Sequence, residues 1–516
     1  MTAAIAVTAG IAAFSLSAPA VQAAPIVAAS VAWTYNHNGA GAGTTSEILA
    51  HDPDNQRIYV AGGEGVDVLD AQTGTLVATI PLDTARFSVV NSVAVKNGKV
   101  AIAAAASNVQ QNGSVLVYDT ANLGGTPTEI VVGANPDMVT FAQNGTKLLV
   151  ANEGEPNSAY TDDPVGSVSV IDVATSTVQD AGFSGFDAQK AALIANGVRI
   201  FGPGASVSQD LEPEYIAVSP DGTKAYVTLQ ENNALAIVDI SGATPTVTEI
   251  VPLGYKDHSQ PGQGLDPSDR DAIGIENPTN VFGMYQPDGI ASFEKNGTSY
   301  LITANEGDAR DYSGFAEEAR VKDLSLTGFP ANADDDDELG RLTVTTTLGQ
   351  DGSGDYEELY AFGARSFSIL DENGNIVFDS GDMIERILSE EFPGFWPDGR
   401  EDNKGPEPES VVVGEVGELL FAFVGLERSD AIMVFGIDDP LNPYFAGLIS
   451  NGGDEAPEGL DFISAEDSFD GGAYLAVGNE DSGTTTLFRL TAVPEPSAAL
   501  ILAVAAAGLI AGRRRR

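Results

Sequence analysis

A short strand-forming unit recurs through most of this 516-residue chain, and this repeat constrains the fold more than any other feature. In the clearest copy, Pro213 to Asp239, an acidic residue precedes a strand, a Pro-Asp-Gly-Thr turn, a second strand, an acidic turn and a third strand. The strands are rich in β-branched residues and the turns in Gly, Asn and Asp, as antiparallel hairpins require. Aligned on the opening position, the copies begin at Glu47, Asn91, Asp137, Glu214, Asp288, Glu409 and Glu458.

The distances between these positions predict the architecture. They are 44, 46, 77, 74, 121 and 49 residues, and three of them match the ~40–50 residues of a four-stranded propeller blade. The longer ones indicate the same unit with insertions, near residues 183–211, 255–286 and 309–357. We therefore predict an all-β fold over residues 31–490, a seven-bladed β-propeller of the YVTN/WD40-like type with loop and helical insertions, rather than three separate domains.

Sequence patterns also predict how the ring closes. The last copy ends at Leu490 after three strands, and the strand pattern of Val31–Tyr35 is predicted to supply the missing fourth strand. Helical patterns occur only within insertions, at Asp187–Asn196 and Asp382–Glu391. Two short strands within residues 367–378 are predicted to form a hairpin, the outer half of the fifth blade.

Composition excludes several classes of function. The chain has 74 Asp and Glu against 25 Lys and Arg, a formal net charge of −49, which disfavours binding to nucleic acid. It has no Cys, so disulfides and thiolate metal sites are excluded, and its three His are few for a zinc site or a Ser-His-Asp triad.

Both ends of the chain have the pattern of export signals. Residues 1–23 are Ala-rich and apolar and end in small residues, as in a secretory signal peptide. At the other end, Val493-Pro-Glu-Pro-Ser497 precedes an apolar stretch, 498–512, and four arginines. Segment 493–516 resembles the PEP-CTERM sorting signal, which implies transient membrane anchoring through 498–512, recognition by exosortase-type sorting machinery and delivery to the surface or matrix. An ordinary tail anchor is the alternative.

Acidic residues recur at two positions of the repeat, the start of the first strand and the turn after the second strand. In an antiparallel hairpin these positions share one edge, so we expect the acids to converge on one mouth of the central channel. Arg and Lys are scarce in these turns, so a hard divalent cation is the expected counter-ion, and oxygen ligands favour Ca²⁺. The predicted metal ligands are Glu47, Asp137, Glu153, Glu214, Glu231, Asp288, Glu306, Asp308, Glu409, Glu427, Glu458 and Glu480. The alternative for any one of them is that it caps a turn.

Other candidate sites have weaker support. Asp334–Glu338 has the pattern of a solvated charge run, Asp351–Glu358 departs from the EF-hand loop, and Asp266–Asp271 is either a self-paired surface turn or part of a site. The phosphate-loop, zinc-protease and nucleophile-elbow motifs are absent, and His258 is expected at the surface.

Several motifs together resemble one known family. They are Ser46–Ile48, Ala151–Pro156, Glu212–Tyr215, Leu229–Asn233, Gly283–Gly289, Thr303–Tyr312, Phe362–Ser368 and Lys404–Ser410. This set resembles the choice-of-anchor I family of exported bacterial proteins, which is also similar to animal mesenchyme-specific cell-surface glycoproteins. The resemblance implies a propeller-like body at the cell surface or in the extracellular matrix, and it provides no catalytic residues to transfer.

These observations predict a non-enzymatic surface protein. We expect a Ca²⁺-binding adhesion or interaction module, with extracellular polysaccharide or another surface protein as its partner. The alternative is a Ca²⁺-dependent phosphoesterase similar to the propeller phytases, in which bound cations organise phosphate and activate water.

Overall fold

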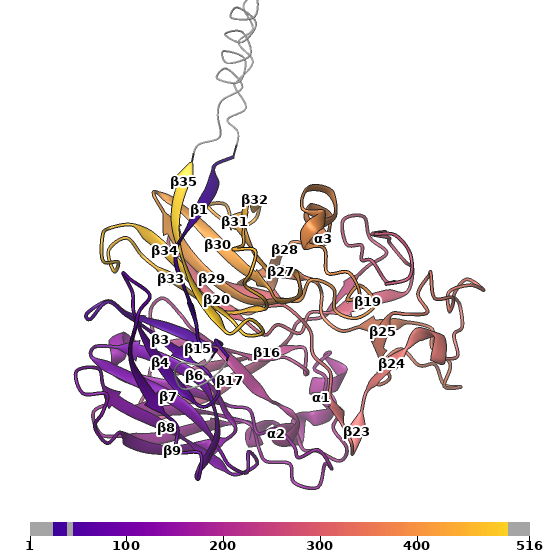
Figure 1. Cartoon of the computed structure of the whole chain (residues 1–516). Helices are drawn as coiled ribbons and strands as arrows, with labels where there is room; N and C mark the ends of the chain where they lie inside the picture. Colours follow the sequence, from indigo (N-terminus) through magenta and orange to yellow (C-terminus); the bar gives the residue numbers. More distant parts are fainter. Residues whose placement is uncertain (1–23, 39–44, 494–516) are drawn as a thin grey trace, which may run out of the picture.

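The computed structural model describes residues 24–38 and 45–493, and the main elements of this part of the chain are seven four-stranded antiparallel sheets (Figure 1). The first three sheets are β2 (Leu49–Asp52), β3 (Arg57–Ala61), β4 (Gly65–Asp70), β5 (Leu76–Pro81); β6 (Phe87–Lys96), β7 (Lys99–Ala106), β8 (Asn112–Asp119), β9 (Thr128–Ala134); and β10 (Pro136–Ala142), β11 (Lys147–Asn152), β12 (Ser167–Asp172), β13 (Thr177–Gly182).

The next three sheets follow the same order. They are β14 (Pro213–Val218), β15 (Lys224–Leu229), β16 (Ala234–Asp239), β17 (Thr246–Pro252); β20 (Ile290–Lys295), β21 (Thr298–Asn305), β27 (Ser366–Asp371), β28 (Ile376–Asp379); and β29 (Pro408–Val416), β30 (Leu419–Leu426), β31 (Ala431–Gly436), β32 (Tyr444–Ile449). The predicted hairpin is β27 and β28, and it completes the sheet that β20 and β21 begin.

The two ends of the described chain share the remaining four-stranded sheet. It contains β33 (Pro457–Ile463), β34 (Ala473–Asn479), β35 (Thr484–Val493) and β1 (Ile26–Asn36), and β1 pairs with β35 from Ile26 opposite Val493 to Asn36 opposite Thr484. This β1 strand contains the Val31–Tyr35 segment that was expected to close the ring. The Trp33 indole N–H also donates a hydrogen bond of 2.9 Å to the carbonyl of Ala71, which ties this sheet to the first one.

Contacts between the sheets show that they form a ring. The first strands of successive sheets, β2, β6, β10, β14, β20, β29 and β33, contact one another in that order, and β33 contacts β2. A separate cluster of buried apolar side chains lies between each pair of adjacent sheets. Radially arranged four-stranded sheets around a channel define a β-propeller, so the predicted fold class is confirmed.

The insertions form structure of their own beside the ring (Figure 1). The first contains η2 (Ser184–Gln189), α1 (Lys190–Ala195) and α2 (Val207–Asp210); the other two build one mixed sheet with its own apolar core, from β18 (Tyr255–Asp257), β19 (Val281–Met284), β26 (Leu359–Ala361), β25 (Thr343–Thr345) and β24 (Glu318–Arg320). The remaining elements are η1 (Gln143–Gly145), β22 (Asp311–Tyr312), β23 (Phe315–Ala316), η3 (Val321–Asp323), α3 (Met383–Glu391), η4 (Pro393–Phe395) and η5 (Glu427–Ser429).

Both predicted export signals lie almost entirely outside the described residues, since 1–23 and 494–516 are not among them. Within the part of the chain that is described, no helix has the length and apolar character that crossing a membrane requires.

Candidate cation-binding site at the channel mouth

A recurrent backbone turn precedes the first strand of several sheets and orients the acidic side chain there. In five sheets the acid follows a proline, and in four of these the residue before the proline has a left-handed backbone, with φ of 45° at Asn135, 41° at Gln286, 53° at Glu407 and 57° at Ala456. Proline disfavours helical backbone in the residue before it, and a left-handed non-glycine residue costs ~1–3 kcal/mol. Strain of this kind persists where the surrounding structure requires it, so its recurrence at one mouth indicates a functional region.

The same turn brings the second acid beside the first. The Glu153 N–H donates to the Asn135 carbonyl over 3.0 Å, the Glu427 N–H to Glu407 over 3.0 Å, and the Glu480 N–H to Ala456 over 2.8 Å. Each bond joins the turn after the second strand to the start of the first strand in the same sheet. The expected pairing of the two acidic positions therefore has a backbone cause.

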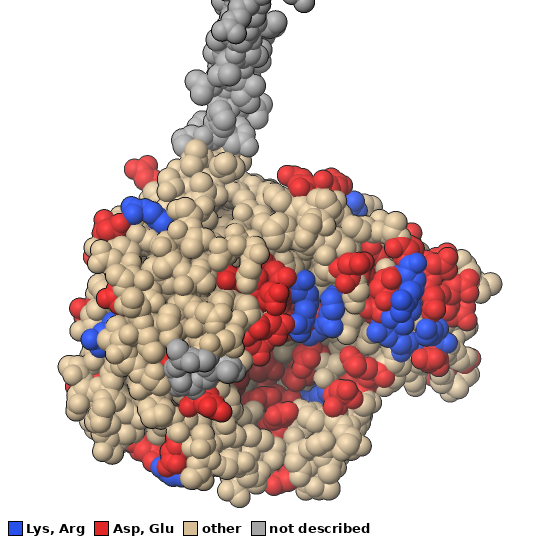
Figure 2. All heavy atoms as spheres, viewed as in Figure 1, with Lys and Arg blue, Asp and Glu red and all other residues tan. Residues whose placement is uncertain are grey.

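The acids surround a cavity of about 400 Å³, which we call the acidic cavity. Figure 2 shows acidic side chains gathered around a hollow, with basic side chains along one side. The predicted residues that line the cavity are Asp137, Glu153, Glu214, Asp288, Glu306, Asp308, Glu409, Glu427 and Glu458. Glu47, Glu231 and Glu480 do not line it, although their charges act on the acids that do.

Burial and mutual repulsion raise the pKa of these carboxyls. Burial is the larger cause and neighbouring carboxylates the second, and together they raise the pKa of Asp137 to about 7. Burial also raises the pKa of Asp308 to about 7 and that of Glu427 to about 8, although Lys404 and Arg428 oppose the increase. The same two causes raise the pKa well above its ordinary value at Glu153, Glu214, Asp288, Glu409 and Glu458.

Two groups of three carboxylates have the spacing that one metal ion requires. Within each group the oxygen atoms lie within 4.8 Å of one another, and Glu306 belongs to both. One group adds Asp288 and Glu409 to Glu306, and the other adds Glu407 and Glu427. The groups differ in their ion pairs. Among the described residues, the second group has several, whereas in the first group Glu306 alone is paired, with Lys404.

Several carboxylate oxygens around the cavity lack a hydrogen-bond partner. Among the described residues, the Oε2 atoms of Glu214, Glu409 and Glu458 are buried without a donor, and the side chain of Glu214 is only 8% exposed. A buried acceptor without a donor is costly, so these oxygens favour a bound cation.

The expectation that basic partners are scarce is only partly correct. The Lys404 ammonium lies 2.5 Å from Glu306 and 3.3 Å from Glu407, and Arg428 lies 2.7 Å from Glu427. Burial alone would raise the pKa of Glu407, but Lys404 and Arg400 outweigh it and lower that pKa. Lys404, Arg428 and Glu407 were not predicted as site residues; the Lys404–Ser410 motif is the one signal in the sequence that includes two of them.

The remaining candidates lie outside the acidic cavity. His258 is not at the surface as expected: it is 1% exposed, its Nδ1 lies 2.6 Å from the Gln263 carbonyl, and burial lowers its pKa to about 3. Asp351 accepts the N–H groups of Ser353 and Asp355 within its own turn, and Asp269 pairs with Arg341. The charge run at 334–338 is mostly exposed, as expected.

Known proteins match this chain as follows. The family model of the choice-of-anchor I domain matches residues 47–440. Gigasin-3a of Magallana gigas is 27% identical over 189 residues, which are 31% of this chain and 66% of that protein. The mesenchyme-specific cell surface glycoprotein of Strongylocentrotus purpuratus is 28% identical over 295 residues, 48% of this chain and 37% of that protein. The matches therefore span only part of the length of these relatives.

Solved structures resemble the chain at low sequence identity. Kuenenia stuttgartiensis hydrazine synthase matches with a TM-score of 0.48 and 13% identity, over 88% of this chain and 99% of that one. The WD40 domain of Neurospora crassa Pan2 matches with a TM-score of 0.43 and 10% identity, over 89% and 95%. Similarity at this level carries no information about activity.

Proposed function

This chain belongs to the choice-of-anchor I family, and from that membership we propose that it is an exported cell-surface propeller whose acidic cavity binds Ca²⁺. Export is supported by the terminal sequence patterns and by the similarity to a protein that is itself named a cell surface glycoprotein. Sorting would proceed through the C-terminal segment by exosortase-type machinery, with 498–512 as a transient anchor.

One observation carries the calcium proposal: the carboxylates of the acidic cavity outnumber the basic side chains near them. Arg428 is the one basic residue that lines the described cavity, against nine predicted acids, and Lys404 contacts Glu306 from beside it. Ca²⁺ accepts six to eight oxygen ligands in flexible geometry, whereas Mg²⁺ requires near-octahedral order and Zn²⁺ prefers nitrogen or sulfur. We assign the ion to Asp288, Glu306 and Glu409, the group with fewer ion pairs.

Calorimetric titration of the purified chain with Ca²⁺ tests this assignment. We expect the metal-stripped protein to bind Ca²⁺, and Asp288→Asn with Glu409→Gln to weaken the affinity at least about tenfold, since each change removes a charged ligand. Asp334→Asn with Glu338→Gln, in the mixed-sheet insertion, is the matched control and should bind as the unchanged protein does. Equal binding by the site variant and the control would refute the assignment.

The surface role that follows is adhesion rather than catalysis. An ion held at the mouth keeps coordination positions for a partner's oxygen atoms, and extracellular polysaccharide or a surface protein supplies such groups. A generic phosphoester assay with Ca²⁺ separates this proposal from the phosphoesterase alternative, because adhesion predicts no turnover. Turnover that requires Ca²⁺ and is lost with Asp288→Asn and Glu409→Gln would favour the enzyme.

A further inference from the structure

A second cavity lies in the channel next to the acidic cavity. It has a volume of about 430 Å³, and Ile48, Ser92, Met138 and Tyr215 line both cavities. The two spaces are therefore successive compartments of one channel, and each is large enough for a small organic molecule.

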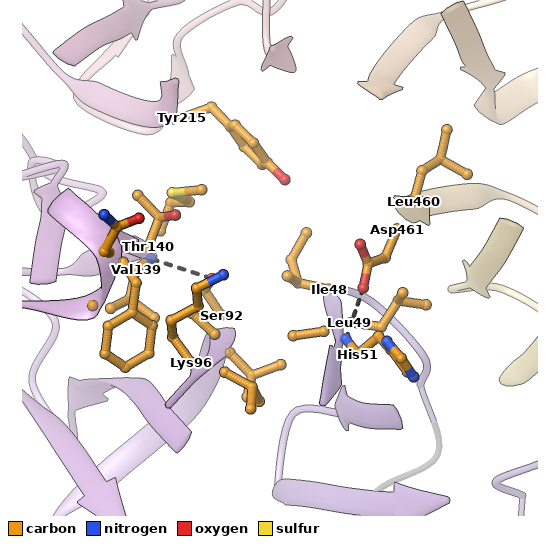
Figure 3. A pocket seen from close by; sticks show the side chains of 18 residues that line it. Ile48, Leu49, His51, Ser92, Lys96, Val139, Thr140, Tyr215, Leu460 and Asp461 are labelled. Atoms are coloured by element: carbon orange, nitrogen blue, oxygen red, sulfur yellow. Dashed lines mark hydrogen bonds between the residues drawn. The ribbon is translucent and has the colours of Figure 1, made fainter. Parts of the chain in front are cut away.

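Two polar groups point into this second cavity (Figure 3). The Tyr215 hydroxyl and the Asp461 carboxylate are directed into the same space from opposite walls. Asp461 Oδ2 accepts a hydrogen bond of 2.7 Å from the backbone N–H of His51, which fixes the orientation of the carboxylate. Asp461 is therefore an oriented acid facing the interior of the channel.

The other titratable groups of the second cavity do not neutralise this acid. Burial lowers the pKa of His51, so its ring is neutral at pH 7. Lys96 also lines this cavity, but its side chain is exposed to solvent. Burial raises the pKa of Asp461 to about 7, so an ammonium group held beside it would favour its charged form.

The wall between the two acidic regions is largely apolar. Ile48 and Met138 belong to it, together with the ring of Tyr215. Asp461 follows Glu458 by three residues on β33, which is about 10 Å along an extended strand. A ligand that reaches both acids must therefore carry two positive groups joined by an apolar chain of about this length.

We propose that the channel binds a linear aliphatic diamine, with one terminal ammonium among the carboxylates of the acidic cavity and the other at Asp461. The methylene chain packs on Ile48, Met138 and the Tyr215 ring, as the stems of lysine side chains pack on apolar surfaces. One end of the ligand rests on the carboxylates of the proposed calcium site, so Ca²⁺ and the diamine compete there.

Other ligand classes fit the second cavity less well. A divalent cation requires several oxygen ligands, and Asp461 is the one carboxylate that lines this described cavity. An anion would meet mainly acids, because Lys96 and Arg428 are the Lys and Arg side chains among the described residues that line the two cavities. A monoamine fills one end alone, so it cannot account for the second oriented acid.

Calorimetry with 1,7-diaminoheptane, with heptylamine as the single-charge probe of the same chain length, tests the proposal in chelator-treated protein. We expect the diamine to bind at least about tenfold more tightly than heptylamine, because a second charge-assisted contact forms at Asp461. Asp461→Asn should remove that advantage and leave heptylamine affinity unchanged, whereas Asp334→Asn should have no effect.

The outcomes separate this inference from the calcium proposal. If 1,7-diaminoheptane binds no better than heptylamine, or if Asp461→Asn leaves its affinity unchanged, the inference is wrong. Asp461→Asn should also leave Ca²⁺ affinity unchanged, which shows that the variant is folded. Diamine binding that depends on Asp461 in a protein without Ca²⁺ affinity would support the inference while refuting the calcium site.

Discussion

At the scale of the residue, two basic side chains pair with carboxylates of the acidic cavity and so compete with a cation for them. Lys404 approaches Glu306, the carboxylate that both three-acid groups share, and its ammonium also faces Glu407. Burial opposes the charge on Lys404, but the surrounding carboxylates outweigh it and raise the pKa of the amine. Lys404 therefore acts as a built-in cation that competes with a bound ion for Glu306.

Replacing Lys404 should strengthen calcium binding. We expect Lys404→Gln to raise the Ca²⁺ affinity about tenfold, because one positive charge leaves the neighbourhood of the site. Lys322→Gln removes a lysine paired with the exposed Asp336 and is the matched control. Calorimetric titration of both variants is the measurement, and an affinity that falls or stays constant in Lys404→Gln would contradict this role.

The position of Lys404 beside Glu306 could not be predicted from the sequence. The acids at the strand starts were predictable, because each lies at a fixed position in a local repeat. Lys404 contacts Glu306 across 98 residues of sequence, and Arg199 and Arg310 pair with buried acids across even longer separations. No local pattern encodes such contacts, because they depend on how the insertions pack on the ring.

At the scale of the element, the turns after the second strands hold the acids in place. Gly307, between Glu306 and Asp308, has φ of +94°, and a Cβ on it would lie 2.1 Å from the Gly363 nitrogen. Left-handed backbone and close approach to another main chain both require glycine at this position. The turn can therefore be altered without changing any acid.

Gly307→Ala should damage both the fold and the site. We expect a loss of about 3 kcal/mol in the free energy of unfolding, from backbone strain plus overpacking, together with weaker Ca²⁺ binding. The control is Gly297→Ala, at φ of +76° with open space around the Cβ, which should cost only ~1–2 kcal/mol and leave Ca²⁺ affinity unchanged. Denaturant unfolding and calorimetry measure these effects; equal losses in both variants would contradict the account.

Several of the secondary-structure elements are predicted well by local sequence patterns. The hairpins, the closing strand and the short helices of the insertions all follow from periodicity and turn residues. The mixed sheet built from the second and third insertions was not predicted, because its strands have only three or four residues and come from distant segments. Strands this short leave no recognisable alternation in the sequence.

At the scale of the whole molecule, nine of the 74 Asp and Glu residues line one mouth of a closed ring, in a chain of net charge −49. A ring closed by its own terminal strand holds the seven strand starts together without disulfides. The cost is the burial of charged carboxylates and their mutual repulsion, which protons relieve at low pH and a cation would relieve at neutral pH.

Burial of the acids, together with their repulsion, predicts an unusual dependence of stability on pH. The pKa of Asp137 and Asp308 rises to about 7 and that of Glu427 to about 8 on folding, from ordinary values near 4. The folded chain then binds more protons than the unfolded chain between these values, so the free energy of unfolding falls as pH rises from about 4 to 8. Melting temperatures of metal-free protein at pH 5 and 8 test this.

Calcium should reverse that loss. At pH 8 saturating Ca²⁺ should raise the melting temperature, since a ligand of the folded state stabilises it by mass action, whereas at pH 5 protons occupy the carboxylates and the increase should be smaller. A metal-free protein that is more stable at pH 8 than at pH 5 would contradict the raised pKa values.

The central claim, that the acidic cavity is a calcium site, is tested most directly by a crystal structure of the protein grown with Ca²⁺. The account predicts an ion at about 2.3–2.6 Å from carboxylate oxygens of Asp288, Glu306 and Glu409, with the Lys404 ammonium displaced from Glu306. An ion bound only elsewhere, or a cavity in which Lys404 keeps its contact with Glu306 at saturating Ca²⁺ and no ion is found, would contradict it.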